Sequence, residues 1–348
     1  MPRRLLWASL VLAPVTIVLR FGVHAGDVTL FAFAAAALVP LAWLIGEATE
    51  HAAEHTGAGV GGFLNASFGN APELIIALFA VDKGLPNVVR GSIAGSVVSN
   101  LLLVLGLALM LTREDRIDRR SLLGQLGLVL LAVSLFLIPS IPGWHDNPDR
   151  HALAVATIPV AAVLLLVYLG YTRLSLRRHR RAHAASGREP DAAGWSLKLA
   201  IVTLGVATAL TAVISEILVH SIDAFADAAG LSEFFVSAVI VAIVGNAAEH
   251  GGAVVIARRG KIRLASEIAI SSSAQVALLV APAVALLSWA VKPALPLSFR
   301  PIELATMAGA ALLGGWIVAD AKGKRWEGVA MVAAFAAIAV AYGFSGDR

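Results

Sequence analysis

Residues 61–77 read GGFLNASFGNAPELIIA, and residues 240–254 read IVAIVGNAAEHGGAV. Both stretches are largely apolar, and both contain the element Gly-Asn-x-x-Glu. It lies at residues 69–73 in the first stretch and at residues 245–249 in the second, an offset of 176. The recurrence of a polar element inside an apolar segment indicates an internal repeat.

A second pair of polar stretches keeps nearly the same spacing. Residues 96–100 (SVVSN) are echoed by residues 271–275 (SSSAQ), and Glu50 and Glu216 each precede a Gly-Asn-x-x-Glu element by one apolar segment. Transporters are commonly built from two such related halves, with their substrate sites formed by interrupted helices near the bilayer midplane. The repeat therefore predicts a transporter of this general design.

Composition leads to the same class. Of the 348 residues, 58% are hydrophobic and only 14% are charged, against about 25% charged in an average soluble protein. This composition excludes a soluble enzyme and predicts an all-α polytopic membrane protein. The absence of cysteine excludes disulfides, thiolate metal sites and cysteine nucleophiles. The basic residues lie in the loops between apolar spans, so membrane topology explains them without nucleic-acid binding.

The apolar blocks have the length of bilayer-crossing helices. We expect eleven of them: one extra N-terminal helix and two repeats of five helices. Because five is odd, the second repeat enters the membrane from the opposite side, giving inverted topology. The expected spans are residues 5–21, 28–52, 60–81, 88–111, 122–140, 151–172, 196–220, 232–257, 264–290, 301–319 and 326–344.

The expected domain organisation follows from these spans. It comprises an N-terminal extra helix (1–27), a first repeat (28–172), a basic cytoplasmic linker (173–195) and a second repeat (196–348). The distribution of lysine and arginine among the loops predicts a cytoplasmic N-terminus and an external C-terminus. The first span also resembles a signal peptide, but no clear small-x-small cleavage site follows it, which favours a retained helix.

Glu73 and Glu249 are the central functional candidates. A charged residue in hydrocarbon costs at least about 2.5–3.5 kcal/mol by insertion scales, and a bound cation would offset that cost. Asn70 and Asn246 each precede the glutamate by three residues, so amide and carboxylate share one helical face. Pro72, which cannot donate a backbone hydrogen bond, lies in the first element.

Proline and glycine near these residues predict an interrupted helix. Pro72 and Gly69 loosen the same turn, and freed carbonyls there could become further ligands. In the second half Ala248 replaces the proline, so Gly245 alone would have to supply any irregularity.

Two carboxylates with amides, hydroxyls and carbonyls suit a hard divalent cation such as Ca²⁺, and Mn²⁺ is chemically admissible. When the ion leaves, desolvation and mutual repulsion favour protonation of the glutamates. Proton and metal then exclude each other from one site, as a cation/proton antiporter requires. We expect Ca²⁺ and H⁺ as transported species and no cofactor.

Several other polar residues are weaker candidates. Asn100 and Gln275 occupy matching positions in the two halves, and Ser272 lies three residues before Gln275; the other serines of both stretches are expected to be packing residues. Proton coupling could also involve residues other than Glu73 and Glu249, and the candidates for this role are Glu50, Glu216 and His250.

One motif favours another class of protein. His51-x-x-Glu54-His55 matches the HxxEH form of a zinc peptidase, which would make the chain an intramembrane zinc protease. Five letters in a stretch rich in alanine, glutamate and histidine match easily by accident, so the antiporter interpretation is preferred.

The two repeated stretches, together with GSIAGSVVSNLLLVLG (91–106) and SSSAQVALLVAP (271–282), resemble the signature repeats of the calcium/proton exchanger (CAX) family. This family belongs to the cation/calcium exchanger superfamily, and the resemblance covers about residues 28–344. It implies export of cytosolic Ca²⁺ in exchange for protons by alternating access, with gating helices moving against a core that contains the third and eighth spans.

Carried over to this sequence, the resemblance implies a specific set of ligands. It makes Glu73 and Glu249 the central Ca²⁺ and proton ligands, surrounded by the turns at Gly69-Asn70 and Gly245-Asn246 and by Asn100, Ser272 and Gln275. The basic linker departs from the acidic stretch of many members, so a calcium-sensing role for it does not carry over.

Alternatives remain within transport. A Na⁺/Ca²⁺ exchanger, an exchanger of another divalent such as Mn²⁺, and a passive channel are each compatible with buried carboxylates. The sequence leaves the oligomeric state open, a homo-oligomer included. A bacterial inner membrane is the expected location.

Overall fold

The computed structural model describes residues 3–112, 116–145, 148–186, 194–291 and 293–346. These residues form helices and connecting segments, with no β-strand among them beyond an isolated bridge between Arg116 and Lys322. The elements, with π-helical segments labelled η, are α1 Arg3–Ser9, α2 Leu12–Val18, η1 Leu19–Val23, α3 Asp27–Phe68, α4 Ala71–Asp82, α5 Pro86–Val98, η2 Ser99–Val104, α6 Leu105–Leu111, α7 Arg119–Gly143, α8 Arg150–Ser186, α9 Leu197–His220, α10 Ile222–Ala229, α11 Glu233–Phe235, η3 Val236–Val241, α12 Ala242–Gly245, α13 Ala247–Arg258, α14 Ile262–Gln275, η4 Val276–Val280, α15 Ala281–Val291, α16 Pro301–Val318 and α17 Arg325–Ser345.

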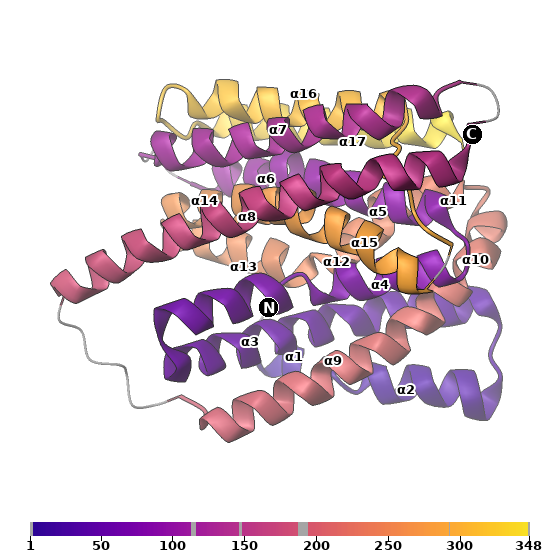
Figure 1. Cartoon of the computed structure of the whole chain (residues 1–348). Coiled ribbons are helices and arrows are strands. Elements are labelled where there is room, and N and C mark those ends of the chain that lie inside the picture. Colours follow the sequence, from indigo (N-terminus) through magenta and orange to yellow (C-terminus); the bar gives the residue numbers. More distant parts are fainter. Residues whose placement is uncertain (1–2, 113–115, 146–147, 187–193, 292, 347–348) are drawn as a thin grey trace.

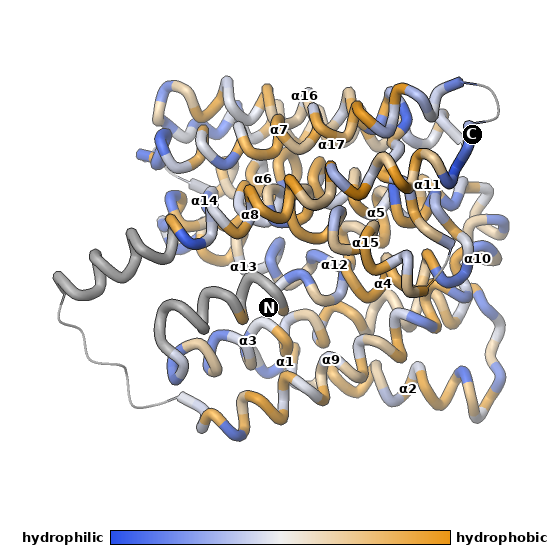
Figure 2. Tube along the Cα trace, viewed as in Figure 1, coloured by the Kyte–Doolittle hydropathy of each residue, from blue (hydrophilic) through white to orange (hydrophobic). Residues whose placement is uncertain are grey.

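The helices are arranged in layers. Figure 1 shows α2, α3 and α9 on one side of the bundle, α7, α16 and α17 on the other, and α4, α5 and α12 to α15 between them. Hydrophobic residues occupy the middle of the long helices and hydrophilic residues gather at their two ends (Figure 2), the pattern expected of a bundle that crosses a bilayer. Of the candidate spans, Pro86–Leu111, which contains α5 of the central layer, has the largest buried share.

The expected count of eleven spans is not confirmed. Within the described residues, nine helices are long and apolar enough to cross a membrane, or up to ten if the bent pair Ile222–Ala229 and Glu233–Gly245 counts as one span. The expected spans 60–81 and 232–257 are not among the nine. Each of these is interrupted near its middle, and the helices that follow the interruptions, α4 and α13, have 12 residues each, too few to cross a bilayer alone.

Two expected boundaries also differ from the structure. Helix α3 continues through residues 52–60, where a break between spans was predicted, and α8 extends to Ser186, well into the predicted linker that starts at residue 173. Residues 173–186 are rich in arginine and alanine, which favour helix, so the polarity of this stretch ends the apolar span of α8 but not the helix. Residues 52–60 include Gly57 and Gly59, so helix propensity does not explain the continuation of α3. Residues 187–193 of the linker lie outside the described residues.

Two crossings bring helices to backbone distance. A Cβ atom built on Gly95 of α5 would lie 2.6 Å from the carbonyl carbon of Ala238 in η3, and one built on Gly328 of α17 would lie 2.7 Å from the backbone nitrogen of Met110 in α6. Such close approach requires glycine. Both crossings join the first half of the chain to the second, the first through α5 of the central layer and the second through α17 of an outer layer.

The turn between α16 and α17 carries a testable ion pair. Lys324 Nζ and the Lys322 backbone N–H both donate to Asp320. The bond from the Lys324 side chain, followed by the bond from the Lys322 backbone, holds the pKa of Asp320 below its ordinary value. A lowered pKa means that the ionised carboxylate stabilises the fold above the ordinary pKa, and this contribution is lost as pH falls through the lowered value. Because the side chains of Asp320 and Lys324 are partly exposed to solvent, the effect on stability is small.

We therefore expect Asp320→Asn to lower the midpoint of thermal unfolding slightly at neutral pH. The difference from the wild type should shrink as the pH falls below about 4, where the carboxylate of the unfolded chain is protonated. Melting curves of both proteins across this range check the expectation. An equal difference at every pH would contradict it.

Candidate functional site

Both Gly-Asn-x-x-Glu elements lie where a helix is interrupted. The chain leaves helical geometry at Asn70, with φ −103° and ψ 19°, and at Asn246, with φ −89° and ψ 9°. Glu73 and Glu249 then fall in the first turns of α4 and α13, where the helix dipole favours negative charge. The second interruption forms without proline, so the asparagine turn is the feature common to the two halves.

Amide side chains join the two halves in matching pairs. Asn70 Nδ2 donates to Gln275 Oε1 at 2.7 Å, and Asn100 Nδ2 donates to Asn246 Oδ1 at 3.3 Å. Asn70 and Asn246 are repeat counterparts, as are Gln275 and Asn100, so the two pairs correspond, although the donor and the acceptor are exchanged between them. The structure thus brings together four residues that the sequence places around the two glutamates, and their role as ligands stays a prediction.

Ser272 connects this amide network to a carboxylate. Its hydroxyl accepts from Asn100 Nδ2 at 3.0 Å and is hydrogen-bonded to the side chain of Glu249. His250 Nε2 lies 3.0 Å from Asn100 Oδ1, a contact that requires the proton to be on Nε2 because the amide oxygen only accepts. His250 thus orients Asn100 and does not contact a glutamate through this nitrogen.

Glu73 approaches the second half directly. A Cβ atom built on Gly245 would lie 3.3 Å from Glu73 Oε1, a tight contact, so the Glu73 carboxyl group packs directly against this glycine. Glu73 is 5% exposed, and its side chain interacts electrostatically with that of Glu249. The two carboxyl groups, one from each half, therefore share one buried region.

Three oxygens of this region lack a hydrogen-bond donor. Within the described structure, Asn70 Oδ1, Glu73 Oε2 and Glu249 Oε2 are buried and unpartnered. A buried acceptor without a donor is costly, and a cation or a proton satisfies it. Asn246 differs from its counterpart Asn70, because its Oδ1 already accepts from Asn100. The geometry thus favours Asn70 over Asn246 as a direct ligand.

Sequence reasoning missed one contact and one backbone feature. Ser96, expected to be a packing residue, accepts from Asn246 Nδ2 at 2.8 Å. Asn100 lies within the π-helical segment η2, and Gln275 directly precedes η4. Such π-segments often occur at functional sites. The matched serines in both halves were the available signal for Ser96, whereas no residue pattern announces a π-helix.

The structure leaves Glu50 and Glu216 out of this site. Both are exposed side chains, on α3 and α9 respectively, and the structure records no contact between either of them and the buried carboxyl groups. Their proposed part in proton coupling stays a prediction.

The geometry does not support the zinc peptidase alternative. His51 Nδ1 lies 3.1 Å from Glu54 Oε2, whereas His55 Nε2 lies 2.6 Å from the carbonyl oxygen of Trp195. His51 also stacks on the Trp195 ring. No group of three or more histidine, aspartate or glutamate side chains that could hold a metal is found in the described part of the chain. The motif instead attaches Trp195 to α3.

Comparison with known proteins matches this arrangement to a family. A family model described as sodium/calcium exchanger protein matches residues 27–177 and 199–343. The chain belongs to this family. This chain is 35% identical over 328 residues to the Ca(2+)/H(+) antiporter ChaA of Bacillus subtilis, and the match covers 92% of this chain and 93% of the relative. It is 33% identical over 346 residues to a Ca(2+)/H(+) antiporter of Synechocystis, covering 92% of each.

Solved structures agree. This chain superposes on the structure of native YfkE with a TM-score of 0.83 and 31% identity, and the match covers 99% of this chain and 100% of that one. An H+/Ca2+ exchanger CAX matches in fold, with a TM-score of 0.73 at 19% identity over 98% of this chain and 92% of that one. The predicted superfamily membership and the helical transporter fold are confirmed, and the chain is an integral membrane protein.

Removing the Asn100 side chain tests the amide network. Asn100→Ala should raise the Ca²⁺ concentration for half-maximal transport about tenfold, because a buried network loses three contacts. Vesicle flux at graded Ca²⁺ concentrations measures this value. Gln125→Ala is the matched control, since Gln125 is a buried amide of α7 bonded to Ser121, outside the site. Equal effects of the two variants would contradict a role for the network in binding.

Proposed function

We propose that this chain is a secondary active transporter that exports Ca²⁺ from the cytosol in exchange for protons. One observation carries the proposal: the buried oxygens Asn70 Oδ1, Glu73 Oε2 and Glu249 Oε2 have no donor in the described structure and come from both halves of the repeat. Oxygen ligands of this kind suit Ca²⁺. The names of the relatives in Bacillus subtilis and Synechocystis support the same substrate pair.

Exchange follows from competition for these oxygens. Two carboxylates balance one divalent cation, and protons neutralise the same carboxylates when the ion leaves. A pair of uncompensated charges in the bundle interior is costly. The transporter therefore changes between its inward-facing and outward-facing conformations only when Ca²⁺ or protons neutralise the site. In alternating access, each conformation then exposes a neutralised site to one side of the membrane.

The proposal also includes the membrane, the orientation and the oligomeric state of the transporter. The transporter works without a cofactor and without enzymatic turnover, in a bacterial inner membrane. Its N-terminus is cytoplasmic and its C-terminus external, because the basic loops then face the cytoplasm. A homo-oligomer is compatible with this arrangement, since each chain contains a complete set of candidate ligands.

Reconstituted vesicles test the proposal. With an acidic lumen that contains a pH-sensitive dye and a Ca²⁺ indicator, external Ca²⁺ should enter while luminal pH rises, in the absence of Na⁺. Ca²⁺ entry without proton movement would indicate a channel, and entry only with luminal Na⁺ would indicate a sodium-coupled exchanger; either result overturns the proposal. Parallel runs with Mn²⁺ measure selectivity among divalents.

A further inference from the structure

A cavity lies where the turn between α4 and α5 meets the start of α8 and the segment before α16, and neither Glu73 nor Glu249 lines it. It encloses about 550 Å³. Its charged or titratable lining residues are Arg90, Arg150 and His151, and no aspartate or glutamate is found among the lining residues that the structure describes. The cavity is therefore lined by positive charge without a lining carboxylate.

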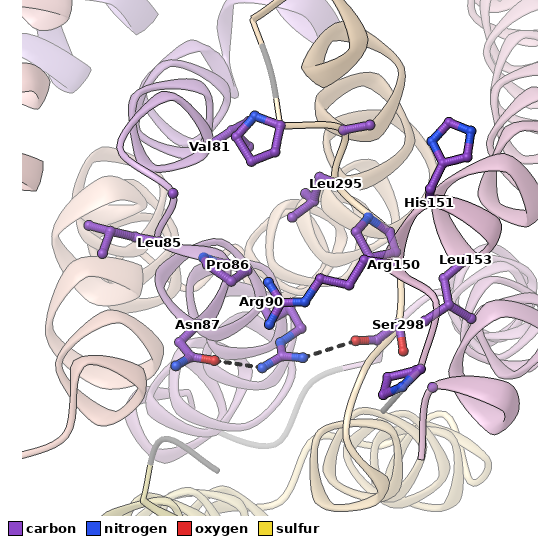
Figure 3. A pocket seen from close by; sticks show the side chains of 16 residues that line it. Val81, Leu85, Pro86, Asn87, Arg90, Arg150, His151, Leu153, Leu295 and Ser298 are labelled. Atoms are coloured by element: carbon purple, nitrogen blue, oxygen red, sulfur yellow. Dashed lines mark hydrogen bonds between the residues drawn. The ribbon is translucent and has the colours of Figure 1, made fainter. Parts of the chain in front are cut away.

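Arg90 is held rigidly at the wall of this cavity. Its Nη1 donates to the Ser298 carbonyl at 3.2 Å and its Nη2 to Asn87 Oδ1 at 2.6 Å, bonds that Figure 3 shows as dashed lines. Its Nε is buried and makes no hydrogen bond within the described residues. This nitrogen lies 3.9 Å from Glu303 Oε2, beyond hydrogen-bonding distance. Each Nη group carries two hydrogens, and these bonds use one of each, so a planar guanidinium fixed in this way is suited to donate its remaining Nη hydrogens to an oxyanion.

Among the described residues, the nearby carboxylates neutralise this positive charge only in part. Glu303 is fully buried and accepts from Arg300, through Nε at 2.6 Å and the backbone N–H at 3.0 Å. It therefore serves two arginines, Arg300 and Arg90. Asp149 accepts from the first backbone N–H groups of α8, those of His151 and Ala152, at 2.9 and 3.1 Å. It is used as a helix cap and does not line the cavity.

Arg150 supplies the second cation. Figure 3 shows its side chain extending across the cavity toward Arg90, and Arg90 has Arg150 among its electrostatic neighbours. The start of α5 also lines the cavity, at Pro86, and its N-cap Leu85 provides no side-chain cap. The positive end of that helix dipole adds to the attraction for an anion.

We propose that this cavity binds one phosphate-type oxyanion between Arg90 and Arg150. Two like charges facing one cavity repel each other, and an anion with several acceptor oxygens removes the repulsion while accepting from both guanidinium groups. The oxyanion comes either from free inorganic phosphate or from the phosphate of an anionic lipid headgroup at this end of the bundle. Both sources present the same chemistry to the arginines.

The test uses the full-length protein with inorganic phosphate and with phosphatidylglycerol as probes. Calorimetric titration in detergent measures the dissociation constant for phosphate. Native mass spectrometry after reconstitution into vesicles of phosphatidylcholine with phosphatidylglycerol measures retained anionic lipid. Arg150→Gln is the main variant, because Arg150 is exposed and contributes no hydrogen bond to the described fold. Melting curves establish that each variant is folded.

We expect Arg150→Gln to weaken phosphate binding at least about tenfold, or to remove most of the retained phosphatidylglycerol. Arg150→Lys, which keeps the charge without the planar fork, should fall between the two. Arg258→Gln is the control, since Arg258 is an exposed arginine at the opposite end of the bundle. Loss of the phosphate signal identifies free phosphate as the source, and loss of the lipid signal identifies the headgroup. Failure of the wild type to bind either probe, or binding that Arg150→Gln leaves unchanged, would overturn the proposal.

Discussion

Replacing Glu73 by glutamine is expected to abolish the exchange of Ca²⁺ for protons while leaving the protein folded. Glutamine keeps the size and shape of the side chain in its space beside Gly245. It removes one of the two negative charges that balance a divalent cation, and its amide cannot take up a proton. Breaking a buried charge interaction by removing one partner costs about 3–5 kcal/mol, so transport should fall at least about a hundredfold.

The measurement is vesicle flux with both Ca²⁺ and pH dyes. Glu54→Gln makes the same chemical change at an exposed residue of α3, where Glu54 contacts His51. It should retain transport, whereas a zinc peptidase would depend on that motif. Exchange at the wild-type rate in Glu73→Gln would show that the buried carboxyl group is not the shared ligand.

The core of the site was predictable from the sequence. Buried glutamates in repeated elements are costly in a membrane, and their shared offset requires them to meet if the halves are inverted. The structure brings Asn70 together with Gln275, and Asn246 together with Asn100. The positions of these residues in the repeat were sufficient to place them in one site.

The partners of each residue were not predictable. Which serine accepts from Asn246 depends on the angle at which α5 crosses η3, and that angle is fixed by side-chain packing that one sequence does not display. Helix ends were also misplaced, since polarity marks where a membrane span stops while helix propensity decides where the helix stops. The continuation of α8 to Ser186 shows the two signals separating.

Gly95→Ala is expected to give the second large effect, by forcing α5 and η3 apart. The new methyl group would lie 2.6 Å from the carbonyl carbon of Ala238 and 2.7 Å from its Cα, closer still to the carbonyl oxygen. Because the obstructing atoms are backbone, no rotamer change relieves the clash, and the cost lies at the upper end of the range for overpacking, about 1–3 kcal/mol. The midpoint of thermal unfolding should fall by several degrees.

Transport should fall with stability in Gly95→Ala, because α5 runs directly into the π-segment that holds Asn100. Displacing this helix moves the Asn100 amide away from Asn246 Oδ1, which is 3.3 Å away in the structure. Gly124→Ala is the matched control: nothing lies within 4 Å of a Cβ atom at this position of α7. Alanine is favoured over glycine inside a helix by about 1 kcal/mol, so this variant should be at least as stable as the wild type. Similar losses of stability in both variants would mean that helix geometry, and not the close crossing of the two repeats, explains the need for glycine at position 95.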